Sequence, residues 1–210
     1  MPKNRTVPRC RFFDISTSAP CNLWDTQDWT PLCKSTGPSA FETKFKTLWC
    51  EKGIYFLIFS ADDHFKPSRL NDFDDLYNED VVEVFLHPDT DQRLYLEFEV
   101  SPFNKELTLL VPQSSSGKFK GWLPWHYEGE RKIIHTIHKD GGSTDWQAEI
   151  FIPFTLMMGL NNVPPVQNTT WQANICRIKY TANNEHTYWS WQPMTSNTFH
   201  NLSDFGTLIF

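Results

Sequence analysis

The stretch Asp75–Leu86, with the sequence DLYNEDVVEVFL, decides the fold class of this chain. Its second half is rich in β-branched and aromatic residues, which favour strands. Side chains of a strand point alternately to its two faces, so Val82, Val84 and Leu86 share an apolar face and Glu83 lies on the other. The acidic first half, which carries one tyrosine, predicts a loop that leads into the strand.

The segment Leu94–Val100, with the sequence LYLEFEV, repeats this alternation. One of its faces is apolar, and the other combines Tyr95 with Glu97 and Glu99. Each of the two strands therefore has a core face and a second face that mixes aromatic residues with carboxylates. For Glu97 and Glu99 two interpretations stay open, namely an ordinary solvated face of an antiparallel sheet and a functional face.

Short runs of the same kind follow most of the chain, separated by turn-forming segments such as KDGGS and TANNE. The further predicted strands are 41–48, 53–60, 106–111, 133–139, 146–152, 170–180, 186–191 and 206–210. Only Pro153–Leu160 predicts a helix, and a short one. The pattern predicts an all-β fold, an antiparallel β-sandwich of immunoglobulin or jelly-roll type with few short helices, in a single domain spanning residues 1–210.

Charge and hydropathy exclude several classes of partner. The formal net charge is -6, which argues against a nucleic-acid partner, because phosphate backbones need clustered Lys and Arg. The longest nearly apolar run, Ile54–Ala61, is too short for a membrane span. No signal peptide is visible at the N-terminus, and localisation stays open between a cytoplasmic protein and an exported one whose leader has been removed.

Cysteine and aromatic content narrow the chemistry further. The five cysteines are scattered and lack a C-x-x-C pair, which favours free, mostly buried thiols over a zinc or redox site. Aromatic residues make up 15% of the chain, with nine tryptophans. Some of these residues are expected in the core, and others are candidates for ligand platforms.

Four motifs in order carry a resemblance to a known family. They are Phe59–Asp63 (FSADD), Tyr77 followed by Glu79–Phe85, Trp171–Arg177 (WQANICR) and Trp189–Gly206 (WSWQPMTSNTFHNLSDFG). Together they resemble family 9 carbohydrate-binding modules, members of the wider DOMON-like β-sandwich group. The likeness extends from about Asp62 to the C-terminus. It implies non-catalytic binding of a glycan or oligosaccharide of the xylan or cellulose type.

The resemblance also implies a site in which two aromatic side chains sandwich a terminal sugar. Tyr77 corresponds to one of them and Trp191 to the other, with Trp189 as an alternative on the same strand face. Apolar C–H faces of a pyranose stack on aromatic rings, and its hydroxyls need partners such as Glu83, Asn174 or Arg177. The family also offers an arginine near the second strand, where this chain has the glutamates of LYLEFEV.

Structural roles compete with these assignments. Arg177 is equally a candidate partner for a carboxylate on a neighbouring strand, and Trp171 is a candidate core residue. Trp122 and Trp125 could form a second platform or cover a sheet edge. Tyr77 and Trp191 are predicted to face each other across a gap one pyranose wide, with Glu83 at its floor.

The acidic region between residues 62 and 80 is a candidate calcium site. Carboxylate oxygens are the ligands that calcium prefers, and the candidate ligands are Asp62, Asp74 and Asp80. The EF-hand spacing is absent from this region. A structural calcium ion is therefore the one cofactor that the sequence indicates.

Other functions are predicted to be weaker alternatives. The sequence contains no G-x-S-x-G, H-E-x-x-H or P-loop motif, so an enzyme is not expected. A haem or redox domain of the DOMON type would need axial ligands such as Met157, Met158, Met194 or His200. A structural or interaction sandwich that has lost sugar binding is the other alternative.

Overall fold

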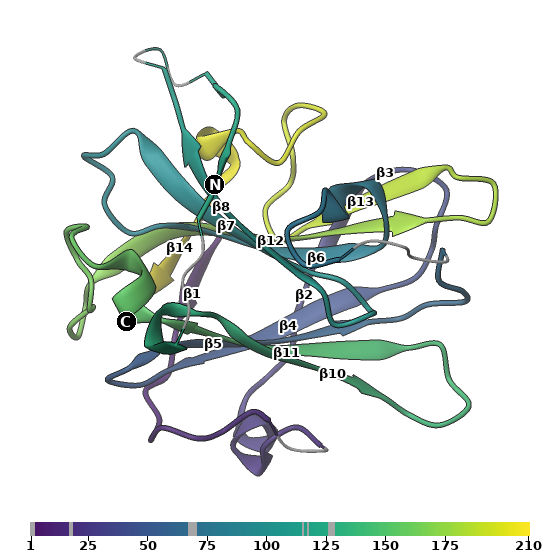
Figure 1. Cartoon of the computed structure of the whole chain (residues 1–210), viewed down its shortest axis with the longest axis horizontal. Coiled ribbons are helices and arrows are strands. Elements are labelled where there is room, and N and C mark those ends of the chain that lie inside the picture. The colour runs from purple at the N-terminus through teal and green to yellow at the C-terminus, as the bar shows by residue number, and fades with distance from the viewer. Residues whose placement is uncertain (1–2, 17–18, 67–70, 115, 117, 126–128) are drawn as a thin grey trace.

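Two β-sheets packed face to face form the body of the protein in a computed structural model, which describes residues 3–16, 19–66, 71–114, 116, 118–125 and 129–210 (Figure 1). In these residues the larger sheet has nine strands and the smaller sheet has five. All strand pairs are antiparallel except the parallel pair of β1 with β14. The predicted all-β sandwich is confirmed.

The nine-stranded sheet has the order β1-β14-β12-β6-β7-β8-β9, with β13 paired to β12 and β3 paired to β13. Its strands are β1 (Asn4–Thr6), β3 (Cys33–Thr36), β6 (Val81–His87), β7 (Leu94–Val100), β8 (Glu106–Pro112), β9 (Leu123–Pro124), β12 (Thr170–Tyr180), β13 (His186–Ser190) and β14 (Gly206–Ile209). The strands that carry the glutamates, β6 and β7, lie in the middle of this order. Both are therefore paired along both edges.

The five-stranded sheet has the order β10-β11-β5-β4-β2. Its strands are β2 (Thr30–Pro31), β4 (Thr43–Trp49), β5 (Gly53–Ser60), β10 (Ile134–Lys139) and β11 (Trp146–Pro153). The long predicted strands all form, to within two residues at each end. The short strands β1, β2, β3 and β9 were not predicted, because two to four residues carry too little alternation to stand out.

The described helices are single 3-10 turns: η1 (Asn22–Thr26), η2 (Leu76–Asn78), η3 (Gly129–Arg131), η4 (Phe154–Met157) and η5 (Leu202–Asp204). The helix predicted within Pro153–Leu160 thus forms as one turn, η4. Across the described ranges, none of the helices has the length and apolar character needed to cross a bilayer.

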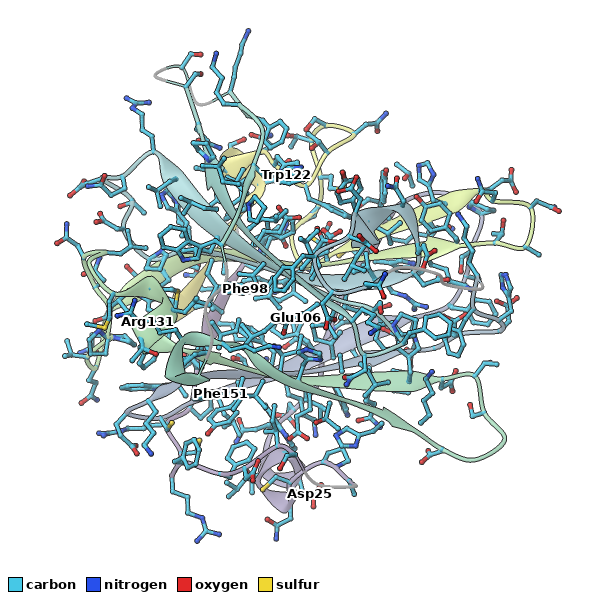
Figure 2. The ribbon with its side chains drawn as sticks, viewed as in Figure 1. Asp25, Phe98, Glu106, Trp122, Arg131 and Phe151 are labelled. Carbon is cyan, nitrogen blue, oxygen red and sulfur yellow. The ribbon has the colours of Figure 1, made fainter. Side chains whose placement is uncertain are left out.

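Three apolar layers hold the sheets and their coverings together. The largest lies between the two sheets and contains the predicted core face of β6 and β7, including Val82, Val84 and Phe98 (Figure 2). A second cluster lies on the outer face of the nine-stranded sheet, where Phe85 and Tyr95 meet Phe199 and Phe205 of the C-terminal segment. The third covers the five-stranded sheet beneath the N-terminal segment around Trp24. The larger sheet is therefore buried on both faces over β6 and β7.

A buried ion pair joins β12 to the end of β5. Arg177 lies 2.8 Å from Asp62 and also donates to Thr43 of β4, and Lys179 lies 2.5 Å from the same carboxylate of Asp62. All of these side chains are buried. Burial lowers the pKa of Arg177, and the charge of Asp62 opposes that shift. The motifs FSADD and WQANICR are thus brought together as a structural link between the sheets.

Replacing Asp62 with Asn is expected to lower the free energy of unfolding by about 3–5 kcal/mol, because the buried Arg177 would lose its paired carboxylate and Lys179 would keep only its longer contacts with Asp63 and Asp80. Urea unfolding followed by tryptophan fluorescence measures the change. The matched control is Asp63→Asn, since the Asp63 side chain is 59% exposed and an exposed pair contributes up to about 1 kcal/mol. An equal, small effect of both substitutions would contradict the structural role assigned to Asp62.

Candidate functional site

A cleft of about 350 Å³ opens on the outer face of the nine-stranded sheet. Its floor is formed by strand residues, among them Glu83 of β6, Glu97 of β7 and Tyr188 of β13. Tyr77 of η2 belongs to one of its walls. The second wall comes from the segment that links β8 to β9, and residues 197–200 complete the rim.

Strand register brings the carboxylates together at the floor. Glu83 pairs directly with Glu99 across β6 and β7, while Glu97 pairs with Phe85 and so lies diagonally from Glu83. The carboxylate oxygens of the three glutamates lie within 4.8 Å of one another. Like charges placed opposite each other destabilise a sheet. This register therefore lowers the stability of the sheet more than the same residues would on a solvated face.

The three glutamates are also removed from water. Glu83 is 2% exposed, Glu97 3% and Glu99 0%, so the interpretation of a solvated face is wrong. Four of their oxygens, including both of Glu99, have no hydrogen-bond partner outside the group in the described part of the chain, and the side chains of Glu97 and Glu99 hydrogen-bond to each other. The described cleft lining contributes no Lys or Arg to balance them.

Burial therefore shifts the acid–base behaviour of the floor. Burial raises the pKa of Glu97 to about 8. Burial also raises the pKa values of Glu83 and Glu99 well above the ordinary value of a glutamate, and the neighbouring carboxylates add to that shift. Without a cation, these groups keep protons near neutral pH. A protonated carboxyl group can both donate and accept a hydrogen bond.

Aromatic side chains form the walls of the cleft. Tyr77 is half-buried at η2, and Tyr180 donates a hydrogen bond of 3.2 Å from its hydroxyl to the Tyr77 carbonyl oxygen. Trp122, just before β9, packs partly buried against the second apolar cluster, above the outer face of the sheet (Figure 2). Phe119 stacks on the imidazole of His200 with ring centroids 4.3 Å apart. The cleft thus combines exposed ring surface with a polar floor.

His200 adds a polar group to the cleft. Its Nδ1 lies 2.7 Å from the Tyr95 hydroxyl, and burial lowers the pKa of His200 to about 4 while burial raises the pKa of Tyr95. The imidazole is therefore neutral and the phenol keeps its proton, so the direction of this hydrogen bond follows the tautomer of His200. In the tautomer whose Nδ1 accepts from Tyr95, the other ring nitrogen carries a hydrogen that can be donated.

Two of the predicted sugar contacts lie in this cleft, and two do not. Tyr77 and Glu83 both line it, as the sequence predicted. Trp191 is wrong as the second platform, because it is 1% exposed and its ring packs edge-on against Phe45 in the core between the sheets. Trp189 is 7% exposed in the same core. Neither can face Tyr77, since the sheet lies between them.

Asn174 and Arg177 do not line the cleft either. Asn174 is buried, and its side-chain oxygen accepts hydrogen bonds from the backbone nitrogens of Ile175 and Gln192. Arg177 points to the opposite side of β12 and pairs with Asp62. The structural alternative for Arg177 is therefore the correct one.

The three predicted calcium ligands do not form one group that could hold an ion, although Asp62 and Asp80 both lie beside the ammonium of Lys179. Asp62 is paired with Arg177 and Lys179, and Asp80 accepts hydrogen bonds from the backbone nitrogens of Tyr180 and Lys66. Asp74 instead accepts bonds from Asn71. Within the residues that the structure describes, the carboxylate groups that could hold an ion are Asp62–Asp63–His64 and Glu83–Glu97–Glu99.

Sequence reasoning missed several residues of the cleft. Tyr180 and Tyr188 lie on strands, but assigning them to the glutamate face requires the pairing of Ile178 with both Val81 and Tyr188, which the sequence does not reveal. Phe119 and His200 lie in loops, where no periodicity marks a side chain as part of a site. Trp122 was left open between a platform and an edge cover, while Trp125 donates to the Leu156 carbonyl and packs against the core.

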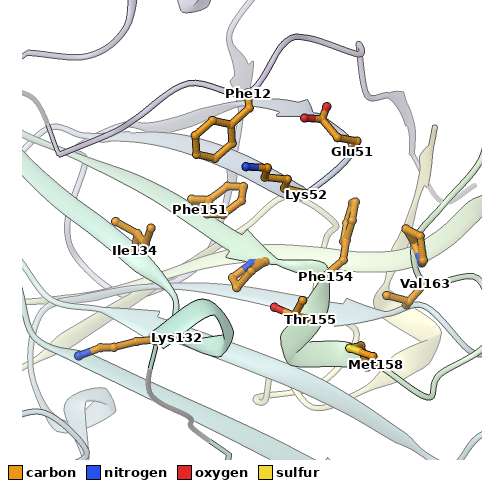
Figure 3. Close-up of a pocket in the computed structure, with 13 residues that line it drawn as sticks. Phe12, Glu51, Lys52, Lys132, Ile134, Phe151, Phe154, Thr155, Met158 and Val163 are labelled. Carbon is orange, nitrogen blue, oxygen red and sulfur yellow. The ribbon is translucent and has the colours of Figure 1, made fainter.

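A second, larger cavity of about 560 Å³ lies at the edge of the five-stranded sheet. Figure 3 shows Phe12 and Phe151 at one end and Met158 and Val163 at the other. Its lining is mainly apolar, with few groups that could pair with ligand hydroxyls. Neither site supports the haem alternative, because two of its candidate axial ligands lie in different sites. Met158 lines this cavity, and His200 lines the cleft.

Comparison with known proteins identifies the family of the chain. The family model described as carbohydrate family 9 binding domain-like matches residues 21–210. Among curated protein sequences, none matches this chain significantly.

The solved structures that resemble the chain share its whole architecture. A candidate carbohydrate-binding protein from Bacteroides uniformis has a TM-score of 0.79 at 17% identity, with each chain covered completely. A carbohydrate-binding module of family 9 from Caldicellulosiruptor kristjanssonii, solved with glucose, has a TM-score of 0.72 at 15% identity over 99% of this chain and 95% of that one. The same values of identity and TM-score hold for the cellotriose complex of a module from that organism, which is covered over 93%. The chain belongs to the carbohydrate family 9 binding domain-like family, whose members bind carbohydrate without catalysing a reaction.

Proposed function

We propose that this protein binds the end of a glycan in the cleft above β6 and β7, with a sugar ring against Tyr77 and Trp122. The observation that carries the proposal is the union, in one cleft, of aromatic walls with a floor of buried carboxyl groups. The solved complexes of similar modules with glucose and cellotriose support a β-linked glucan as the first ligand to test. Xylan-type oligosaccharides are the second.

Each part of the cleft matches one feature of a pyranose. The ring faces expose C–H groups, which pack on aromatic surfaces such as Tyr77 and Trp122. The hydroxyls at the ring edge need donors and acceptors, which Glu83, Glu97 and His200 supply at the floor and rim. The larger cavity also has aromatic rings, but its polar side chains are Glu51, Lys52, Lys132 and Thr155, none of them a buried carboxyl group, so size alone does not select it as the site.

Tyr77→Ala and Trp122→Ala are each expected to weaken sugar binding at least about tenfold, because each removes one apolar wall and a wall contact contributes on the order of 1 kcal/mol or more. Glu83→Gln should weaken binding less, since the amide retains an acceptor and a donor. Calorimetric titration of the full chain with cellotriose and xylotriose measures these effects.

The matched control is Phe12→Ala, which removes a 41% exposed ring from the other cavity. It should leave the affinity unchanged. Loss of binding in this variant, with wild-type affinity in the Tyr77 and Trp122 variants, would move the site to the apolar cavity. Failure of the wild-type chain to bind any sugar on a glycan array would favour an interaction module that has lost its ligand.

The floor also predicts how stability depends on pH in chelator-treated protein. Between pH 6.5 and 8 the folded chain keeps the proton of Glu97, whereas the unfolded chain, with a Glu pKa near 4.5, has lost it. The folded state thus binds more protons in this window, so the free energy of unfolding falls as pH rises, by up to about 1.4 kcal/mol per pH unit for each such group. Below pH 6.5 the lowered pKa of His200 contributes the opposite slope.

Urea unfolding at several pH values from 6.5 to 8 measures this slope. Glu97→Gln should flatten it, because the amide is neutral in both states, and should make the protein more stable than wild type at pH 8. A slope of zero in the wild-type protein would mean that the floor carries no retained protons.

A further inference from the structure

The glutamate group at the floor, Glu83, Glu97 and Glu99, has donor atoms arranged as in an ion site. One carboxylate oxygen from each residue lies within 4.8 Å of the others, so a common centre lies no more than about 2.8 Å from all three, close to the about 2.3–2.6 Å at which calcium takes oxygen ligands. All three side chains come from the central strands β6 and β7, whose register fixes them relative to one another. Preformed ligands on rigid strands lose little freedom when an ion binds.

The buried oxygens also lack partners, which points to a ligand. Both oxygens of Glu99 and one each of Glu83 and Glu97 are buried without a hydrogen bond to any described residue outside the group, and the side chains of Glu97 and Glu99 hydrogen-bond to each other. Buried polar atoms are nearly always paired, and a buried carboxylate usually has a cation beside it. The neighbouring titratable groups on the adjoining elements, Asp75, Tyr77, Tyr95, Cys176 and His200, include no permanent cation.

We propose that Glu83, Glu97 and Glu99 bind a calcium ion at the floor of the cleft. Calcium takes carboxylate oxygens at about 2.3–2.6 Å and accepts irregular geometry, whereas magnesium demands a near-ideal octahedron and zinc prefers nitrogen and sulfur. Three carboxylates more than balance its two positive charges. The ion site shares Glu83 and Glu97 with the proposed sugar cleft, but ion binding needs no sugar and is measured in sugar-free protein, so the two proposals can fail independently.

An ammonium group of an amino sugar is the competing occupant, and the burial pattern disfavours it. A ligand in the cleft meets Glu83 and Glu97, which line it, but Glu99 does not line the cleft and is fully buried. An ammonium would leave both Glu99 oxygens unpaired. A bare ion between the strands satisfies all three carboxylates, and the side of the ion that faces the cleft can accept water or sugar hydroxyls.

The test uses the full chain after removal of metal with EDTA and without sugar. Titration with terbium, whose luminescence is sensitised by nearby aromatic side chains such as Tyr77, followed by displacement with calcium chloride, measures ion affinity. Calorimetry with calcium chloride and with magnesium chloride gives selectivity. We expect calcium to bind, to displace terbium, and to bind at least about tenfold more tightly than magnesium.

The variants Glu99→Gln and Glu97→Gln should each weaken calcium binding at least about tenfold. The matched control is Asp63→Asn, which alters the second carboxylate group, Asp62–Asp63–His64, and should leave the affinity within about twofold. Circular dichroism verifies folding, and the amides are neutral like the protonated acids that they replace in the metal-free protein. No calcium binding by the wild-type chain, loss of binding only in Asp63→Asn, or binding of glucosamine that calcium does not affect would each overturn the proposal.

Discussion

The burial of the nine-stranded sheet on both faces is the constraint on which the rest of the structure depends. An antiparallel sheet with one free face would leave Glu83, Glu97 and Glu99 in water, where their register would cost little. Here η2 and the C-terminal segment cover that face around Phe85 and Tyr95. The carboxyl groups are therefore dry, and the retained protons, the unpaired oxygens and the polarity of the cleft all follow from this covering.

Two groups of buried charge show opposite solutions to the same problem. On the inner face of β12, Asp62 meets Arg177 and Lys179, and the charges offset one another in a link between the sheets. On the outer face, the glutamate group has no such partner among the described residues. A carboxylate group whose charge is balanced by Arg or Lys fixes the packing and has no need of a ligand. A carboxylate group without such a partner is neutralised only by protons or by a bound ligand. Both groups are buried, and they differ in whether a cationic side chain lies beside the carboxylates. That difference, more than burial, separates the structural charge from the candidate site.

Most of the fold was predictable from the sequence, and about half of the site. Alternation of period two identified the long strands and the core face of β6 and β7, because a half-apolar strand has few other ways to bury its surface. It also indicated Tyr77 and Glu83, which the structure brings together in one cleft. It could not place Trp191, since alternation says which residues share a face but not whether that face looks inward. That choice is made by register, in which Trp189 pairs with the inward-facing Arg177.

The glutamate floor links the choice of sugar to whatever occupies it. As three bare anions it would repel the electron-rich hydroxyl oxygens of a glycan and strain its own sheet. As protonated acids it offers hydrogen bonds that can be donated or accepted, and with a dication it offers coordination to vicinal hydroxyls. In the proposed binding mode, either state holds a neutral sugar between Tyr77 and Trp122, but the two favour different hydroxyl geometries. That proposal places specificity at the floor of the cleft, while the aromatic walls supply affinity that depends little on which pyranose is bound.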